Sequence, residues 1–135
     1  MSIKPKFVKR ALYIPSILMH KVVEIMTGIS IPDSAIIGRR LVIEHFGGII
    51  IHGNAVIGDD VIIRQGVTIG NIGNANPSGA PKIGNRVSIG AGAKIIGSLK
   101  IGDDVKIGAN AVILRDIPSG CTAVGVPARI IRRRT

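Results

Sequence analysis

The sequence predicts an all-β fold, a parallel β-helix of hexapeptide repeats that follows a short N-terminal helical segment. The first observation is a run of isoleucines spaced six residues apart, at positions 83, 89, 95, 101, 107 and 113. The same spacing appears upstream, at positions 31, 37 and 43 and again at 51, 57, 63 and 69. The second is composition: 18 of 135 residues are glycine and only 2% are aromatic, unlike an ordinary globular core.

A period of six fits neither an α-helix nor a simply alternating strand, but it fits a short strand followed by a tight corner. Three such units close one triangular coil, and each strand then pairs in parallel with the coils above and below, about 4.8 Å away. β-Branched isoleucine packs well in the resulting columns. Glycine and pairs such as Asp59-Asp60 suit the corners. A β-sandwich would need irregular spacing and more aromatic residues.

The length fits one domain in three segments. We expect residues 1–28 to be helical, with Pro15 dividing two short segments, and residues 29–118 to form the repeats. Residues 119–135 are expected to cap the open end and finish in a basic tail. Two interruptions stand out: the step from Ile43 to Ile51 is two residues too long, and residues 71–82 read as a polar projecting loop.

The formal net charge of +10 comes from 18 basic and 8 acidic residues, and the excess sits at the two ends. Residues 29–128 are nearly neutral, with nine basic and seven acidic side chains. No aromatic residues are interleaved with the C-terminal arginines, so no nucleic-acid partner is expected. The N-terminal segment has a basic amphipathic profile. It either lies on an anionic membrane as a peripheral contact or packs its apolar face against the coils or another subunit.

Cys121 is the single cysteine, which excludes an internal disulfide and fits a reducing compartment. It has no basic or histidine neighbour in sequence that favours a nucleophilic thiolate. No Cys/His cluster has metal-ligand spacing, so no metal is expected. The apolar run at 11–19 is too short to span a bilayer, and no signal-peptide cleavage site follows it. We therefore expect a cytoplasmic protein.

Several motifs together resemble the hexapeptide-repeat acyltransferases, and most closely the serine acetyltransferase branch. They are Ile43-Glu-His-Phe-Gly-Gly, Ala80-Pro-Lys-Ile-Gly, Ile89-Gly-Ala-Gly-Ala-Lys-Ile-Ile-Gly and Gly125-Val-Pro-Ala-Arg. The resemblance covers about residues 30–131. It implies a left-handed β-helix, a homotrimer with active sites between neighbouring subunits, and acetyl-CoA as the acetyl donor and co-substrate.

The sequence departs from that branch where the acceptor is chosen. Serine acetyltransferases carry Asp-Ile-His-Pro where this chain has Ser30-Ile-Pro-Asp33, and Ala80 replaces a histidine of their loop. The stretch at 58–71 looks more like the O-acetyltransferases of exopolysaccharide pathways, of the colanic acid type. We therefore expect acetyl transfer to a hydroxyl of a sugar or polysaccharide precursor. The alternatives are a serine O-acetyltransferase and a catalytically inactive β-helix scaffold.

His45 is the candidate general base, because imidazole is well matched to proton transfer at neutral pH and this residue lies in the two-residue insertion. Either Glu44 or Asp33 is expected to orient it, and the sequence leaves that choice open. His52 and His20 read as a corner residue and a helix residue without a catalytic task. A carbonic anhydrase of this fold needs three histidines around zinc, which these spacings do not supply.

The remaining candidates concern coenzyme A. The resemblance places Ala91 and Ala109 where the backbone meets the pantetheine arm, with Gly70 near the thioester. Three cations are candidates for its phosphates, although a solvated corner explains the first two equally well: Lys94, Lys106 and Arg129. The loop at 71–82 is expected to project over a neighbouring subunit and close the acceptor pocket.

Overall fold

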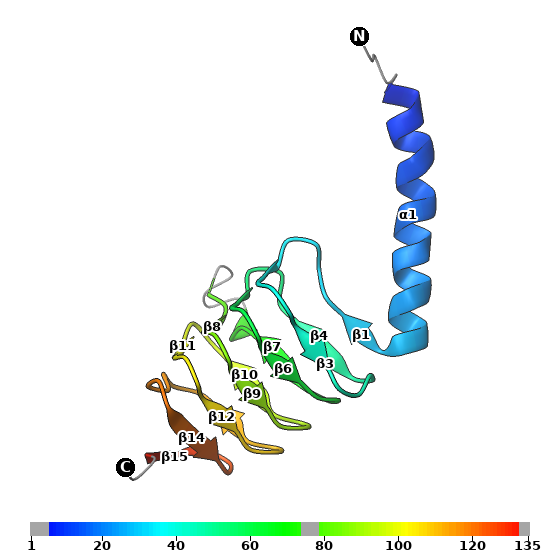
Figure 1. Ribbon diagram of the computed structural model, residues 1–135. Helices are drawn as coiled ribbons and strands as arrows, with labels where there is room; N and C mark the ends of the chain where they lie inside the picture. The colour runs from blue at the N-terminus through cyan, green and yellow to red at the C-terminus, as the bar shows by residue number, and fades with distance from the viewer. Residues whose placement is uncertain (1–5, 74–78, 133–135) are drawn as a thin grey trace.

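The computed structural model describes residues 6–73 and 79–132, and it is a left-handed parallel β-helix with one projecting helix (Figure 1). The centre of the predicted loop (74–78), Lys4 and the last arginines of the tail lie outside the described residues. Helix α1 spans Lys6–Thr27. The predicted fold class is confirmed.

The strands form three sheets, one for each side of the prism. Sheet A contains β1 (Ile29–Ser30), β4 (Ile49–Ile51), β7 (Thr68–Gly70), β10 (Lys94–Ile96) and β13 (Val112–Ile113). Sheet B contains β2 (Ile36–Ile37), β5 (Val56–Ile57), β8 (Lys82–Ile83) and β11 (Lys100–Ile101). Sheet C contains β3 (Val42–Ile43), β6 (Ile62–Ile63), β9 (Ser88–Ile89), β12 (Lys106–Ile107), β14 (Cys121–Val124) and β15 (Arg129–Arg132).

The strand register shows both predicted interruptions. Lys82 pairs with Lys100, eighteen residues further along, as three regular repeats require. Val42 pairs with Ile62, twenty residues along, because the coil between them contains the bulge. Ile62 in turn pairs with Ser88, twenty-six residues along, because that coil contains the longer loop. Both insertions therefore leave the prism at a corner and leave the strand pairing intact.

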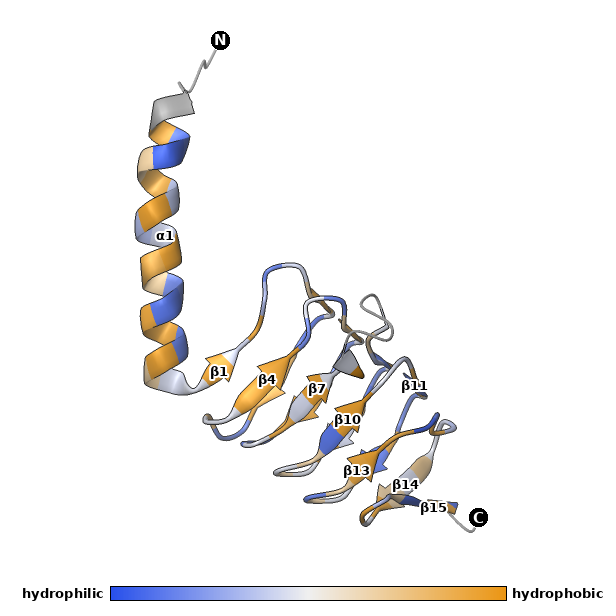
Figure 2. Cartoon of the chain, turned by 180° about the vertical axis from the view of Figure 1, so that it is seen from behind, coloured by the Kyte–Doolittle hydropathy of each residue, from blue (hydrophilic) through white to orange (hydrophobic). Residues whose placement is uncertain are grey.

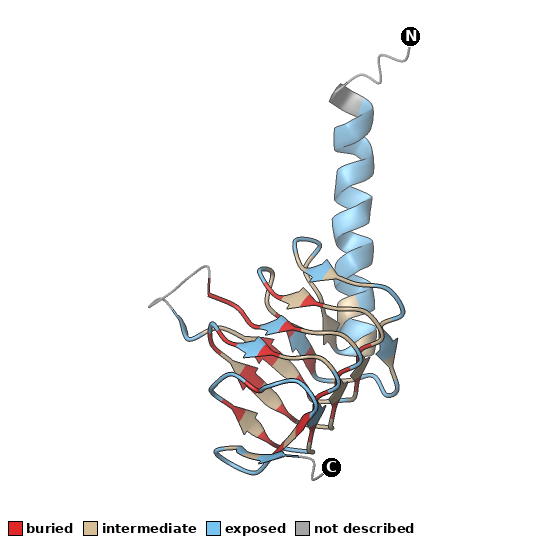
Figure 3. Cartoon of the chain, turned by 60° about the vertical axis from the view of Figure 1, so that its left-hand side comes forward, coloured by how far each residue is buried: buried red, intermediate tan, exposed pale blue. Residues whose placement is uncertain are grey.

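The core is a stack of aliphatic side chains inside the prism. Figure 3 colours the buried residues red along the coils. The isoleucines from position 51 to position 113 that mark the repeats are all at most 4% exposed. The second inward position of each coil is small or aliphatic, as at Val61, Ala93 and Ala111, which are fully buried. The first coil, with Ile31, is only partly buried because no further coil covers it. One residue type thus fills most of the interior, as the spacing predicts.

The corners between sheets B and C are joined by side-chain hydrogen bonds from one coil to the next. Asp59 Oδ1 accepts from the Arg39 N–H at 2.7 Å, and Asp103 Oδ1 accepts from the Asn85 N–H at 2.7 Å. Each of these carboxylates lies against the corner glycine of the preceding coil. A Cβ on Gly84, for example, would lie 2.4 Å from Asp103 Oδ1. The glycine that begins each of these corners is therefore required by close approach.

The next residue of each of these corners adopts a left-handed conformation and carries a charge. Arg40 and Asp60, both with φ of 57°, form an ion pair at 2.5 Å, and Arg86 pairs with Asp104 at 2.8 Å. Each guanidinium holds the pKa of its partner carboxyl, Asp60 or Asp104, below the usual value by hydrogen bonding and charge.

Helix α1 is a single helix that projects from the first coil (Figures 1 and 3). The predicted division at Pro15 is wrong, because proline removes one N–H from the helix without stopping the turns on either side. The expectation that its apolar face packs on the chain's own coils is also wrong, since Leu12, Leu18 and Met26 are exposed. Among the described residues no helix combines the length and apolar character needed to cross a bilayer.

The acidic partners of the corner ion pairs predict a pH dependence of stability. A carboxyl whose pKa is lower in the folded than in the unfolded state stabilises above the unfolded value, near 3.9, and this contribution is lost as the pH falls through the folded pKa. We expect the unfolding temperature of the wild-type chain to decrease as the pH is lowered below ~4. In the double variant Asp60→Asn/Asp104→Asn this decrease with pH should be less steep. Asp33→Asn is the control. If it changed the dependence of the unfolding temperature on pH as much as the double variant does, the corner ion pairs would not be the cause.

Removing part of one isoleucine column should cost much more than shortening an outward isoleucine. Ile95 is fully buried in the middle of the stack, whereas Ile36 is 64% exposed on the outside of sheet B. We expect Ile95→Ala to lower the free energy of unfolding by about 2–5 kcal/mol through lost burial and a cavity. Ile36→Ala should change it by less than about 0.5 kcal/mol in the same denaturant titration. Similar losses in both variants would count against a packed interior.

Candidate active site

Five of the candidate site residues lie at corners of the prism, and the other four lie in strands. Residues 44–48 join β3 to β4 and form the first corner between sheets C and A. Below it lie residues 64–67, 90–93 and 108–111, which make the same connection in later coils. We call this column the C–A edge, and the column containing 31–35, 52–55 and the loop at 71–81 the A–B edge.

The C–A edge contains a stack of glycines from successive coils. Gly48, Gly66 and Gly92 are stacked there with φ between 64° and 72°, a region that favours glycine. A Cβ on Gly48 would lie 3.4 Å from the Gly66 Cα, and one on Gly66 would lie 3.3 Å from the Gly92 Cα. Successive coils therefore approach each other backbone to backbone along this edge.

His45 sits at the top of the C–A edge, in the two-residue bulge. Its side chain is exposed, and Phe46 beside it is 72% exposed. Among the described residues, no hydrogen bond or ion pair engages the imidazole. His52, in contrast, lies at the A–B edge, where its Nδ1 accepts the Asn54 N–H at 3.1 Å and so helps to form the corner. His45 is therefore the histidine of the coils with both ring nitrogens available to a ligand.

Glu44 is held by Arg64, and this pair was missed by sequence reasoning. Arg64 Nε lies 2.6 Å from Glu44 Oε2 in a half-buried ion pair. The same guanidinium donates through Nη1 to Ser88 Oγ at 3.3 Å and to the Ile89 carbonyl at 3.4 Å. Arg64 thus ties the coil that carries His45 to the two coils below. The signal was the register, because Glu44 and Arg64 follow paired residues of β3 and β6.

Asp33 lies at the A–B edge, away from His45 in the chain. It borders a hollow of about 300 Å³ between the first coil and α1, together with His20 and Lys21 of the helix. Strands β2 and β3 and the corner between them separate Asp33 from the bulge. A single chain therefore does not bring these two candidate residues together.

The backbone candidates for coenzyme A, Ala91 and Ala109, are neighbours on the C–A edge. The Asn110 N–H donates to the Ala91 carbonyl at 2.8 Å, and a Cβ on Gly90 would lie 2.5 Å from the Ala109 nitrogen. Gly70 ends β7 and lies at the A–B side of sheet A. The structure thus groups the two alanines with the histidine and places the glycine at another edge.

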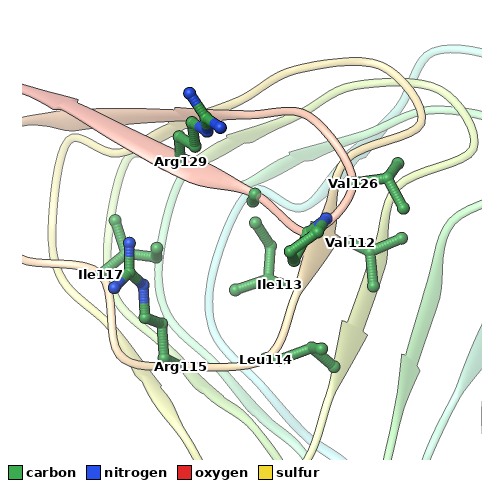
Figure 4. A pocket seen from close by; sticks show the side chains of 9 residues that line it. Val112, Ile113, Leu114, Arg115, Ile117, Val126 and Arg129 are labelled. Carbon is green, nitrogen blue, oxygen red and sulfur yellow. The ribbon is translucent and has the colours of Figure 1, made fainter.

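The three candidate cations differ in their surroundings. Lys94 is half-buried, and its Nζ donates to the Gly66 carbonyl at 2.6 Å and to Thr68 Oγ1 at 3.2 Å. Lys106 is exposed on the outer face of β12. Arg129 begins β15 and lines a hollow of about 450 Å³ at the C-terminal end of the prism, with Arg115 nearby (Figure 4). Within the described ranges, no group of three or more His, Cys, Asp or Glu side chains is placed to hold a metal ion.

The link between Arg64 and Glu44 can be measured directly. We expect a double-mutant cycle of Arg64→Ala and Glu44→Ala to give a coupling of about 0.5–1 kcal/mol in the free energy of unfolding, because the pair is half-buried. Arg64→Ala alone should cost more than Glu44→Ala, since it also loses the contacts with Ser88 and Ile89. A coupling indistinguishable from zero would show that the two side chains do not interact in solution.

Comparison with known proteins gives consistent matches. The family model described as bacterial transferase hexapeptide (six repeats) matches residues 80–115. The serine acetyltransferase of Synechococcus elongatus is 42% identical over 120 residues, which are 89% of this chain and 49% of that protein. A Helicobacter pylori serine acetyltransferase is 46% identical over 125 residues, covering 93% of this chain and 73% of the relative. The chain thus spans about half the length of the first relative.

Solved structures agree with these relatives. Soybean serine acetyltransferase, as the apoenzyme, superposes with a TM-score of 0.74 at 44% identity, over 76% of this chain and 43% of that one. The Brucella abortus serine acetyltransferase in complex with coenzyme A gives 0.72 at 41% identity, over 76% of this chain and 41% of that one. All these proteins are serine acetyltransferases, so the expected closeness to the colanic acid type gains no support from them.

Proposed function

Because this chain belongs to the serine acetyltransferase family of hexapeptide-repeat transferases, we propose that it transfers the acetyl group of acetyl-CoA to a hydroxyl group, with His45 as the general base. The observation that carries this proposal is the position of His45. Its imidazole is exposed, is free of partners within the described part of the chain, and stands at the top of an edge where the glycines of successive coils are stacked.

The proposed reaction is a single acyl transfer. The acceptor oxygen attacks the thioester carbonyl carbon while an imidazole nitrogen of His45 takes the hydroxyl proton. The carbon–sulfur bond then breaks, and the coenzyme A thiolate leaves with a proton returned by the imidazolium. The products are an acetyl ester and free coenzyme A. Glu44 acts through Arg64 in this scheme: the ion pair fixes the bulge that carries His45.

The C–A edge suits the pantetheine arm of the donor. The amide groups of the arm can form hydrogen bonds with backbone N–H and C=O groups, and the small residues Ala91 and Ala109 allow a ligand to approach the backbone along that edge. Lys106 and Arg129 are exposed cations for the coenzyme A phosphates, where charge-assisted hydrogen bonds are strong. Lys94 instead donates a hydrogen bond to the Gly66 carbonyl on the C–A edge. To bind a phosphate, its amine would have to give up that hydrogen bond.

A complete site requires two chains. His45 and the alanines lie on the C–A edge, whereas Asp33, Gly70 and the loop at 71–82 belong to the A–B edge. We propose a homotrimer in which the C–A edge of one subunit faces the A–B edge of the next. Asp33 and Gly70 of one chain then approach His45 of its neighbour, and the loop closes over the acceptor.

The acceptor that the comparisons favour is serine, since the relatives named above are serine acetyltransferases. A soybean enzyme of this family was solved in complex with serine. A sugar hydroxyl is the second candidate, because two positions of this chain lack the groups that the family uses there. Ser30 is half-buried at the start of the prism beside Glu24, and Ala80 is buried in the core. If the chain prefers a sugar, we attribute that preference to the absence of the family's polar groups at these two positions.

The test is a panel of acceptors, with L-serine and several hexoses, in which released coenzyme A thiol is measured. We expect turnover with at least one acceptor and a loss of about 10²–10⁴-fold in kcat for His45→Ala. Arg86→Ala is the control, because this exposed residue lies at a corner between sheets B and C, outside both edges of the proposed site, and it should retain activity. Wild-type activity in His45→Ala would refute the assigned base. Failure to bind coenzyme A at all would favour the inactive scaffold.

A further inference from the structure

Helix α1 carries an apolar face that the rest of the chain leaves uncovered. At 100° per residue, one half of its circumference is aliphatic from end to end. The side chains of this half, which are exposed and colour the helix orange in Figure 2, are Val8, Leu12, Ile14, Leu18, Met19, Val22, Val23, Ile25 and Met26. They extend over about 27 Å of helix at 1.5 Å per residue. We call this surface the α1 apolar face.

The helix is turned so that its other half faces the prism. Tyr13, Ser16 and His20 line the hollow that Asp33 borders on the first coil. These side chains point to the side opposite the α1 apolar face, because they follow the 100° step on the polar half. The apolar face is therefore directed away from the chain's own core and is accessible along its whole length (Figure 3).

The basic side chains of the helix suit contact with an anionic surface. Lys9 and Arg10 lie on the polar half near the N-terminal turns, whereas Lys21 forms an ion pair at 2.9 Å with Glu24, the single acidic residue of the helix. There is no acidic residue in the first turn and no basic residue in the last, so the charges oppose the helix dipole instead of compensating it. An anionic surface close to the N-terminal turns reverses that unfavourable arrangement.

Pro15 favours a hydrated environment for the α1 apolar face over a water-free contact between helices. It lies within the α1 apolar face and has no N–H to donate to the Ala11 carbonyl. In a dry contact between helices, an unpaired carbonyl costs about 1–3 kcal/mol. In the headgroup layer of a bilayer, water remains available to it. The apolar half is also wider than the narrow seam of a two-stranded coiled coil and matches helices that lie in a membrane interface.

We propose that α1 binds peripherally to anionic lipid membranes, with the α1 apolar face in the interface and the basic side chains among the headgroups. The binding surface is separate from His45 and the C–A edge. The inference therefore does not depend on the proposed acetyl transfer, and acetylation of a soluble acceptor should proceed without vesicles.

The test is co-sedimentation of the full chain with vesicles of phosphatidylcholine alone or of phosphatidylcholine with phosphatidylglycerol. We expect binding to the anionic vesicles that is at least tenfold stronger than to the neutral ones and that weakens as salt is raised. Leu18→Glu should weaken binding at least tenfold, because it places a charge on the apolar face, and Lys9→Gln/Arg10→Gln should weaken it several-fold. Ile36→Glu, at an exposed isoleucine of the prism, is the control and should bind normally.

Sedimentation velocity of the same variants tests the competing occupant, a second copy of the chain. An oligomeric state that is unchanged by Leu18→Glu, together with lost vesicle binding, supports the proposal. A change in oligomeric state caused by Leu18→Glu overturns it, since the face is then covered by another subunit. Absence of wild-type binding to anionic vesicles overturns it as well. An unchanged circular-dichroism spectrum and thermal unfolding midpoint of Leu18→Glu show that the variant is folded in either case.

Discussion

The parallel register between successive coils is the constraint on which the rest of this structure depends. Each short strand donates its backbone hydrogen bonds to the next coil, as when the Val42 N–H donates to the Val61 carbonyl and the Ile62 N–H to the Val87 carbonyl, both at 2.9 Å. Such short strands are stable only because their inward isoleucines stack into columns that exclude water. A shift of one residue would turn those columns outward.

The same register explains why both insertions lie at corners. Interior positions accept little besides aliphatic side chains, and the glycine-led corners between sheets B and C are filled by coil-to-coil hydrogen bonds. An insertion at a corner leaves the strands paired, so extra residues there are free to carry chemistry. His45 occupies one such insertion and the loop at 71–82 the other. Because the two lie on different edges, the active site that we propose needs residues from two copies of the chain.

The repeated features of this fold could be predicted from the sequence, whereas features that depend on a single contact could not. The isoleucine period predicted the coils, their corners and both insertions, because each repeat meets the same packing requirement. The pairing of Glu44 with Arg64 depends on the register across an irregular coil, and sequence reasoning about neighbours along the chain did not reach it. Pro15 was over-interpreted as a helix break. Ser30 and Ala80 stood out by resemblance, yet their burial at the prism's start and in its core appears only in three dimensions.

We propose that His45 lies beside the thioester of acetyl-CoA bound along its own C–A edge, with the A–B edge of the next subunit facing it. A crystal structure of the full chain with coenzyme A measures this most directly, through the distance from the sulfur to the nearest imidazole nitrogen. We expect a trimer with the sulfur beside His45 and the pantetheine arm along Ala91 and Ala109. Coenzyme A bound far from His45, or a monomer in which the bulge faces open solvent, would contradict it.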